Sequence, residues 1–332
     1  MQGRARDWQS RLENLSNRRK TGVMKTALIT HEACLRHVLQ ERHPESVARL
    51  RTVLGVLEAE EFALLIREQA PAATLEQLAG VHPHTFVHEI LDMVPDSGFA
   101  FIDGDTPICP DSGEAALRAA GAVVRGVDMV MAGEAQNVFC AIRPPGHHAE
   151  SRRAMGFCLF NNVAVGAEWA REHWGLKRVA VIDFDVHHGN GTQEIFARDA
   201  GLFYGSTHQD NFYPGTGSVR ETGVAGNIVN APLPAGADGA LFQEAMSERV
   251  LPALDTFQPE LIFISAGFDA HAGDPLAGLC LREEDFVWAT RQIMEIAHDH
   301  CNDRVVSTLE GGYDLHALGA SVRAHVRTLM GV

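Results

Sequence analysis

The stretch RVAVIDFDVHHGNGT, residues 178–192, decides the expected fold. Its first seven residues are mostly apolar, whereas the remainder is rich in Asp and His. A nearly continuous apolar run of this length is typical of a strand buried on both faces of a sheet. Five further runs share the pattern: Lys25–Thr30, Asn137–Ile142, Leu202–Gly205, Leu261–Ser265 and Arg304–Leu309.

Amphipathic helical patterns separate these runs. They cover Pro44–Ala59, Ser112–Ala132, Asn162–His173, Ala240–Thr256, Glu283–His300 and His316–Met330. Alternation of strands and helices along most of a chain predicts a parallel sheet with helices on both faces. Because no repeat or linker interrupts the pattern, we expect one α/β domain over residues 24–332, preceded by a solvated basic leader at residues 1–23.

The composition excludes several classes of protein. The 332 residues are 45% hydrophobic, which is enough for a large core, but no apolar run approaches the ~18–20 residues that span a bilayer. The formal net charge is −15, from 43 Asp and Glu against 28 Lys and Arg. A surface of this sign repels phosphate backbones, so we expect no direct nucleic-acid binding. Because no apolar run is long enough to span a bilayer, we expect no membrane partner. It attracts cationic substrates such as lysine-rich peptides and polyamines.

The cysteines and the basic start of the chain bear on the cellular compartment of the protein. Six cysteines are scattered without a Cys-x-x-Cys pair, which indicates reduced thiols in a reducing compartment. The first 23 residues carry six basic and two acidic side chains without an apolar segment. A transit peptide is the alternative to a solvated leader, but Trp8 and the two acids argue against it. We therefore expect a cytoplasmic protein.

Reactive residue types follow several of the expected strands, which is where open α/β sheets bind their ligands. Asp185 and His187 are two residues apart, so in an extended segment both point to one side. Asp269 follows another strand and supplies a third ligand. Two carboxylates and one imidazole leave an open position, as in a catalytic zinc site, although an isolated Asp-x-His pair is more often a solvated turn.

Two further strand ends carry groups suited to proton transfer and to oxyanion binding. Gly146-His147-His148 places two imidazoles in one loop, where one accepts a proton and the other returns it. Glu310-Gly311-Gly312-Tyr313 presents a phenol that can donate a hydrogen bond to a tetrahedral intermediate. Each motif alone also fits a plain surface turn, and their occurrence together after several strands is what indicates a catalytic site.

Taken together, the motifs resemble those of the zinc-dependent histone deacetylases, closest to class II and the bacterial deacetylase-like amidohydrolases. The resemblance covers about residues 25–330 and rests on RPPGHHA, GFCLFNNVAVGA, DFDVHHGNGTQ, FYPGTG, SAGFDAHAGDPLAG and LEGGYDL. It implies a single-domain arginase-like fold with an eight-stranded parallel sheet flanked by helices. It also implies a zinc-dependent amidohydrolase that removes acetyl or other short acyl groups from lysine-like amines.

The resemblance assigns roles to individual residues. By position, Asp185, His187 and Asp269 match the zinc ligands, His147 and His148 match the tandem histidines, and Tyr313 matches the tyrosine that polarises the acyl carbonyl. Asp183 matches the carboxylate that orients the first histidine. Asn190 stands where class I enzymes have an aspartate partner for the second histidine, a departure shared by class II members. An amide stabilises imidazolium less than a carboxylate does, so a lower pKa of His148 is expected.

Other matched positions concern the substrate channel and monovalent cations. Phe157 and Tyr213 match the aromatic pair around the substrate's methylene stem. Gly156 and Gly312 match channel positions, Leu276 the wall residue at the mouth, and Asp105 the rim aspartate. Arg49 matches the arginine of the internal cavity. The resemblance implies two structural K⁺ or Na⁺ ions, the first at Asp183, Asp185, His187, Ser206 and Thr207, and the second at Phe196, Asp199, Leu202 and Asn227.

Alternative functions remain open from the sequence. The first is an acetylpolyamine deacetylase, against which Leu276 argues, because a polyamine-selective branch has glutamate there. The second is a binuclear-manganese ureohydrolase, which shares the fold but leaves the tandem histidines and LEGGY unexplained. The third is a non-catalytic acyl-lysine binding module, which would lack a ligand or Tyr313. The expected partner is an acetylated lysine peptide, protein or small amine, and a homo-oligomer is compatible with the sequence.

Overall fold

One parallel sheet of eight strands organises the molecule, in the order β2-β1-β5-β10-β9-β6-β7-β8. The computed structural model describes residues 23–332. The sheet contains β1 (Thr26–Thr30), β2 (Ile66–Gln69), β5 (Asn137–Cys140), β6 (Val179–Asp183), β7 (Leu202–Gln209), β8 (Ile228–Leu233), β9 (Leu261–Ala266) and β10 (Val305–Leu309). The expectation of an eight-stranded parallel sheet is confirmed.

The register of the central strands brings their carboxyl ends together. Asp183, the last residue of β6, lies beside Ser206 of β7 on one side and Ser265 of β9 on the other. At the end of β10, Leu309 pairs with Ala266 of β9. The loops that follow β5, β6, β9 and β10 therefore leave the sheet on the same side, at the carboxyl ends of the strands, as parallel strands require.

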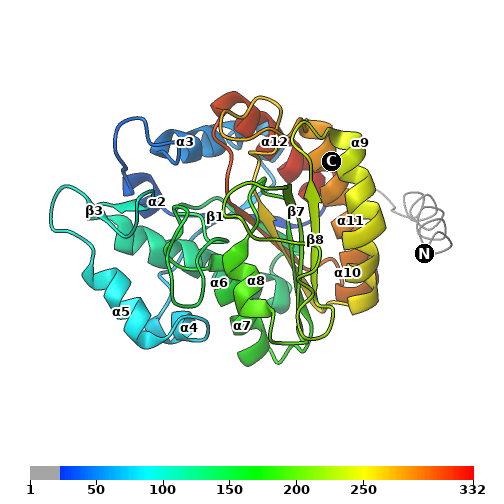
Figure 1. The fold of residues 1–332 in the computed structure, drawn as a ribbon, viewed down its shortest axis with the longest axis horizontal. Coiled ribbons are helices and arrows are strands. Elements are labelled where there is room, and N and C mark those ends of the chain that lie inside the picture. Colours follow the sequence, from blue (N-terminus) through cyan, green and yellow to red (C-terminus); the bar gives the residue numbers. More distant parts are fainter. Residues whose placement is uncertain (1–22) are drawn as a thin grey trace.

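Helices cover both faces of the sheet (Figure 1). The longest are α6 (Ser112–Ala132), α7 (Asn162–Glu172), α11 (Glu283–Cys301) and α12 (Leu315–Met330). The pair α6 and α7 packs on one face, and α11 and α12 pack on the other. The strands between them are buried along their full length, which explains their nearly continuous apolar sequences.

Shorter elements complete the fold. The helices are α2 (Ala33–Arg36), α3 (Val47–Val56), α4 (Leu75–Ala79), α5 (His84–Asp92), α8 (Asn190–Phe196), α9 (Gly239–Ala245) and α10 (Leu251–Phe257). A π-helical turn, η2 (Met246–Val250), joins α9 to α10, and η1 (Glu60–Phe62) is a 3₁₀ turn. A separate antiparallel pair consists of β3 (Ala100–Phe101) and β4 (Pro107–Ile108).

The structure differs from the sequence prediction at the outer strands of the sheet. All six predicted strands are present, with β7 extending to Gln209, but β2 and β8 were not predicted. The sequence of β2, IREQ, carries two charged residues, and that of β8, IVNAPL, contains a proline. Both strands lie at the edges of the sheet, where side chains reach water and one row of backbone groups needs no partner.

Two further expectations concern the chain outside the core. The leader predicted at residues 1–23 lies, except for the exposed Val23, outside the described residues. Within residues 23–332, no helix has the length and apolar character that crossing a membrane requires.

Candidate active site

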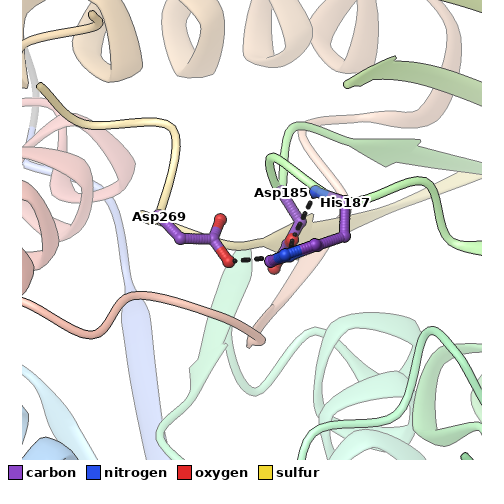
Figure 2. A group of neighbouring side chains, drawn as sticks. All are labelled: Asp185, His187 and Asp269. Atoms are coloured by element: carbon purple, nitrogen blue, oxygen red, sulfur yellow. Dashed lines mark hydrogen bonds and ion pairs between the residues drawn. The ribbon is translucent and has the colours of Figure 1, made fainter. Parts of the chain in front are cut away.

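Asp185, His187 and Asp269 converge at the carboxyl edge of the sheet (Figure 2). Asp185 and His187 lie in the loop after β6, and Asp269 lies in the loop after β9. One ligand atom from each residue lies within 4.8 Å of the other two, and this is the one such group of three among the described residues. The sequence placed these three residues in one site, and the structure brings them together.

The contacts within this group fit a divalent cation. His187 Nδ1 lies 3.0 Å from Asp185 Oδ1 and 3.2 Å from Asp269 Oδ2, so one ring nitrogen faces two carboxylates. A single N–H serves only one of them, and Asp269 Oδ2 is buried without a hydrogen-bond partner. Burial and the neighbouring Asp185 raise the pKa of Asp269 to about 7. A cation bound by all three atoms would give Asp269 Oδ2 a partner and would offset the repulsion between the two carboxylates.

His147 lies between this group and a buried carboxylate. Its Nδ1 is 3.0 Å from Asp183 Oδ2, and its Nε2 is 3.8 Å from Asp185 Oδ2. Tyr204 also donates to Asp183 Oδ2, at 3.0 Å. Burial opposes a charge on the His147 ring, yet Asp185 and Asp183 raise its pKa to about 10. Asp183 therefore fixes the ring so that Nε2 faces the site.

His148 has a different partner and a different electrostatic environment. Its Nδ1 lies 2.9 Å from Asn190 Oδ1, and Asn190 Nδ2 donates to Glu150 Oε1 at 2.8 Å. The bond to Glu150 orients the amide, so its oxygen faces His148 and receives the Nδ1–H. Burial and the neighbouring histidines His147 and His187 hold the pKa of His148 well below its ordinary value. The ring is therefore neutral, with its Nε2 lone pair free.

Tyr313 follows two glycines in the loop after β10. Its ring lies over the guanidinium of Arg49, with 4.9 Å between the Arg49 Cζ and the ring centroid. Burial raises the pKa of the phenol well above its ordinary value, although Arg49 opposes the shift. The phenol thus stays protonated, and no hydrogen bond of its hydroxyl forms with another residue between 23 and 332. It is free to donate to a ligand.

A cavity of about 100 Å³ opens onto this group. Two of its walls, Tyr213 and Leu276, are each 37% exposed, as expected for residues at a channel mouth. Arg49 and Gly312 do not line the cavity; Arg49 lies behind Tyr313 and donates to the Gly312 carbonyl at 2.6 Å. The lining consists of Asp105, Pro145, His147, His148, Gly156, Phe157, His187, Tyr213, Leu276, Gly311 and Tyr313.

The local backbone at Gly156 and Phe157 shapes one wall of the channel. Both residues have positive φ angles, 58° and 68°, and such a conformation is uncommon for phenylalanine. The Phe157 N–H donates to Thr106 Oγ1 at 3.2 Å, and the Phe157 ring packs edge-on against Tyr313. A Cβ at position 156 would lie 2.5 Å from His148 Cδ2, so glycine is required there.

The residues matched to monovalent cations also lie together. Asp183 pairs with Ser206 across β6 and β7, which puts Thr207 next along the same strand as Ser206. In the second set, the backbone carbonyls of Phe196, Asp199 and Leu202 converge on the Asn227 side-chain amide, at 3.0, 3.0 and 2.7 Å. The Asn227 Nδ2 group occupies the point on which these carbonyl oxygens converge, and the second cation stays a prediction.

The histidines that the sequence left outside the metal site have other partners. His188 contacts Thr216 Oγ1 at 2.7 Å, and His208 contacts Ser206 Oγ at 2.9 Å. His271 Nδ1 accepts from the Gly273 N–H at 3.0 Å. None of them belongs to the metal-binding group.

The sequence analysis missed several side chains that hold the site. Glu310 Oε2 accepts from the N–H groups of Gly146 and His147 at 2.7 and 3.2 Å, joining two loops of the site. A Cβ at Gly311 would overlap Asp269 Oδ2.

Glu45 is fully buried and pairs with Arg49 at 3.0 Å. Its place four residues before Arg49 was the available signal, since i,i+4 pairs share a helix face; for Glu310, no local pattern reveals a partner 164 residues away.

Comparisons with known proteins agree with this architecture. Residues 43–329 match the model of the histone deacetylase domain. The chain is 39% identical over 312 residues to Histone deacetylase 14, chloroplastic, of Arabidopsis thaliana, covering 88% of this chain and 74% of that one. It is 41% identical over 274 residues to the histone deacetylase-like amidohydrolase of Pseudomonas aeruginosa, covering 81% and 71%.

A solved structure shows the same fold. The crystal structure of the HDA15 HD domain superposes with a TM-score of 0.87 at 35% sequence identity, covering 93% of this chain and 89% of that one. The fold is therefore the arginase/deacetylase-like α/β fold, as expected. Within that class, the chain belongs to the histone deacetylase family.

Proposed function

We propose that this chain is a zinc-dependent deacetylase that hydrolyses the amide of acetylated lysine-like amines. The observation that carries the proposal is the convergence of Asp185, His187 and Asp269 below a narrow channel, beside two imidazoles and a free phenol. Two carboxylates and one imidazole hold zinc with an open position. When bound there, the ion polarises the acyl carbonyl and acidifies water.

The two imidazoles and the phenol divide the remaining chemistry. The Nε2 lone pair of neutral His148 accepts the proton of the attacking water and then delivers it to the leaving nitrogen. His147, fixed by Asp183 at 3.0 Å, contributes positive charge next to the developing oxyanion. Tyr313 donates its hydroxyl proton in a hydrogen bond to that oxyanion. Water adds to the carbonyl carbon, and the C–N bond breaks to give a free amine and a carboxylate.

The channel favours a slim, linear acylated amine. Phe157, which packs against Tyr313, and Tyr213, which packs against His148, both line the cavity and offer apolar ring surface to a methylene stem. Asp105 also lines it and offers acceptors for backbone N–H groups. Leu276 at the mouth gives no charge to meet a distal ammonium. These features support acyl-lysine over acetylpolyamine substrates, because the distal ammonium of a polyamine needs an acidic group at the channel mouth.

A substrate panel on the zinc-loaded enzyme tests the proposal. We expect turnover of an acetyl-lysine peptide to exceed that of acetylpolyamines in kcat/KM, and we expect short acyl groups to be preferred to long ones. Preference for an acetylpolyamine would reassign the substrate but keep the chemistry. Absence of turnover on every amide in the panel, with zinc bound, would contradict the proposed activity.

We also keep a cytoplasmic location and a solvated basic leader at residues 1–23 as proposals. Two plant relatives carry "chloroplastic" in their names, so the location of this chain needs its own measurement. Fractionation of cells that express the full chain tests the location. Removing residues 1–23 should leave kcat and KM unchanged, because every side chain to which the proposed mechanism gives a role lies within residues 24–332.

A further inference from the structure

Asp274, in the loop between β9 and α11, is a buried carboxylate to which the proposed function gives no role. It is only 8% exposed, yet among residues 23–332 no ion pair involves it. Its charge is instead met by backbone N–H groups: Oδ1 accepts from Leu276 at 2.9 Å, and Oδ2 accepts from Tyr313 at 2.7 Å and from Asp314 at 3.4 Å. Hydrogen bonds to a charged acceptor are among the stronger ones in proteins.

The loop that carries Tyr313 needs such an anchor. Gly311 and Gly312 precede the tyrosine, and Gly311 is required because a Cβ would overlap Asp269 Oδ2. Two successive glycines leave the backbone many accessible conformations. Arg49 restrains the loop before the tyrosine, through the carbonyls of Glu310 and Gly312 at 2.5 and 2.6 Å. Asp274 is the side chain that restrains the backbone N–H of Tyr313 itself.

Asp274 is itself held in place. Its N–H donates to the His271 carbonyl at 2.9 Å, and the strand-like contacts between Ala270, Ala272 and Leu281 close the loop at its base. Further along, the Gly278 N–H donates to Gln209 Oε1 at 2.7 Å. This bond ties the channel lip, the segment around Leu276, to the end of β7. The carboxylate therefore projects from a closed loop and binds N–H groups of the Tyr313 loop, whereas Arg49 binds carbonyls of the same loop.

We propose that Asp274 is a positioning residue that couples the channel lip at Leu276 to the oxyanion donor Tyr313. One carboxylate oxygen serves each element, so a shift of the lip is transmitted to the tyrosine backbone. The inference rests on the proposed function, because it assumes that Tyr313 contacts the reacting carbonyl. It adds that correct placement of the phenol depends on a residue that touches neither substrate nor metal.

The substitution Asp274→Asn separates the two arms of this contact. An amide has one acceptor oxygen, so the variant loses the bond either to Leu276 or to Tyr313, and its NH₂ group then faces another N–H donor. We expect kcat on an acetyl-lysine peptide to fall by about 10- to 100-fold, since displacement of a reacting group by about 1 Å costs up to this much. KM and zinc content should change little.

A double-mutant cycle with Tyr313→Phe gives the decisive readout. If Asp274 acts through the phenol, Asp274→Asn should cost less than about 3-fold in the Tyr313→Phe background, because effects that share one group are not additive. The matched control is Glu260→Gln. Glu260 also accepts from two successive N–H groups, those of Lys177 and Arg178, but it lies at the amino ends of the strands, away from the site. The Glu260→Gln variant should therefore keep wild-type kcat.

The outcomes distinguish this inference from the proposed function. Equal losses from Asp274→Asn in both backgrounds, or no loss in either, would overturn the positioning role. Wild-type kcat in Tyr313→Phe would instead overturn the function on which it rests. If Asp274→Asn does not fold, the same cycle is run with Asp274→Glu, which keeps both oxygens but moves them by one methylene. The same non-additivity is expected, and additivity would again refute the role.

Discussion

The guanidinium carbon of Arg49 lies 4.9 Å from the centroid of the Tyr313 ring, and the same guanidinium donates to two carbonyls of the Tyr313 loop. Arg49 comes from α3, whereas Tyr313 follows β10, so the contact joins two distant parts of the chain. The planar fork of arginine matches both carbonyls and the ring face at once, which a lysine ammonium cannot do.

Arg49→Lys should therefore reduce turnover while the positive charge remains. We expect kcat on an acetyl-lysine peptide to fall by about 10- to 100-fold, because the phenol loses its fixed position. Steady-state kinetics together with zinc analysis check this, and KM and zinc content should be close to wild type. An Arg49→Lys enzyme with unchanged kcat would mean that charge alone supports the tyrosine.

Gly156→Ala should disturb His148. The added Cβ would lie 2.5 Å from His148 Cδ2, so the ring has to move away from its bond to Asn190. Kinetics on the acetyl-lysine peptide should show a loss of about 10²-fold in kcat. Gly133→Ala is the matched control, because Gly133 has a similar positive φ of 74° at the end of α6 but open space around its Cβ position. Equal losses in the two variants would point to backbone strain in place of the clash.

The Glu45 carboxylate should make the free energy of unfolding depend on pH in the acid range. Burial alone would raise the pKa of this carboxyl, but Arg143 and Arg49 hold it at about 2, below the ordinary value of 4.5. A depressed pKa contributes stability that is present above about pH 4.5 and is lost as pH falls toward 2. From the two pKa values, the contribution at pH 7 is about 3 kcal/mol.

The measurement compares urea unfolding of wild type and Glu45→Gln as a function of pH. We expect Glu45→Gln to be less stable at pH 7 and the difference between the two proteins to shrink between pH 4.5 and 2. Both proteins share the other titrating groups, so the difference reports Glu45 together with His37, whose Nε2 lies 3.7 Å from Glu45 Oε2. A difference that stays constant with pH would show that shape, and not charge, accounts for the loss.

Tyr313→Phe should weaken hydrolysis of an unactivated amide more than that of an activated one. Removal of one oxyanion donor typically costs about 10²–10³ in kcat, so we expect that loss on an acetyl-lysine peptide. A trifluoroacetyl substrate has a more electrophilic carbonyl and should be less affected. Zinc content should persist and KM should change little, since the lost bond forms in the transition state. Identical losses on both substrates would argue against an oxyanion role.

The sequence predicted the centre of the fold better than its edges. The buried strands around RVAVIDF carry apolar runs because both of their faces are covered, and that pattern is local. The edge strands β2 and β8 lack it, since their exposed sides accept charged and polar residues. Their pairing with β1 and β7 depends on the finished sheet.

A similar limit applies to the site. Residues that carry reactive groups, such as His147 and Asp269, stand in recognisable motifs after strands. Some residues that hold those motifs from another part of the chain are recognisable only by their partners. Asp274 receives the N–H of a residue 39 positions away, and Glu310 receives that of Gly146, 164 positions away. No periodicity or spacing in the chain encodes such a contact.

The account depends most on the metal site proposed at Asp185, His187 and Asp269. The most direct test measures zinc content and acetyl-lysine hydrolysis together, in wild type and in Asp269→Ala. Wild type should bind one zinc in this group, lose turnover on chelation and regain it with added zinc. Asp269→Ala should lack both the zinc and the turnover. Full hydrolysis by metal-free Asp269→Ala, or by chelated wild type, would contradict the account.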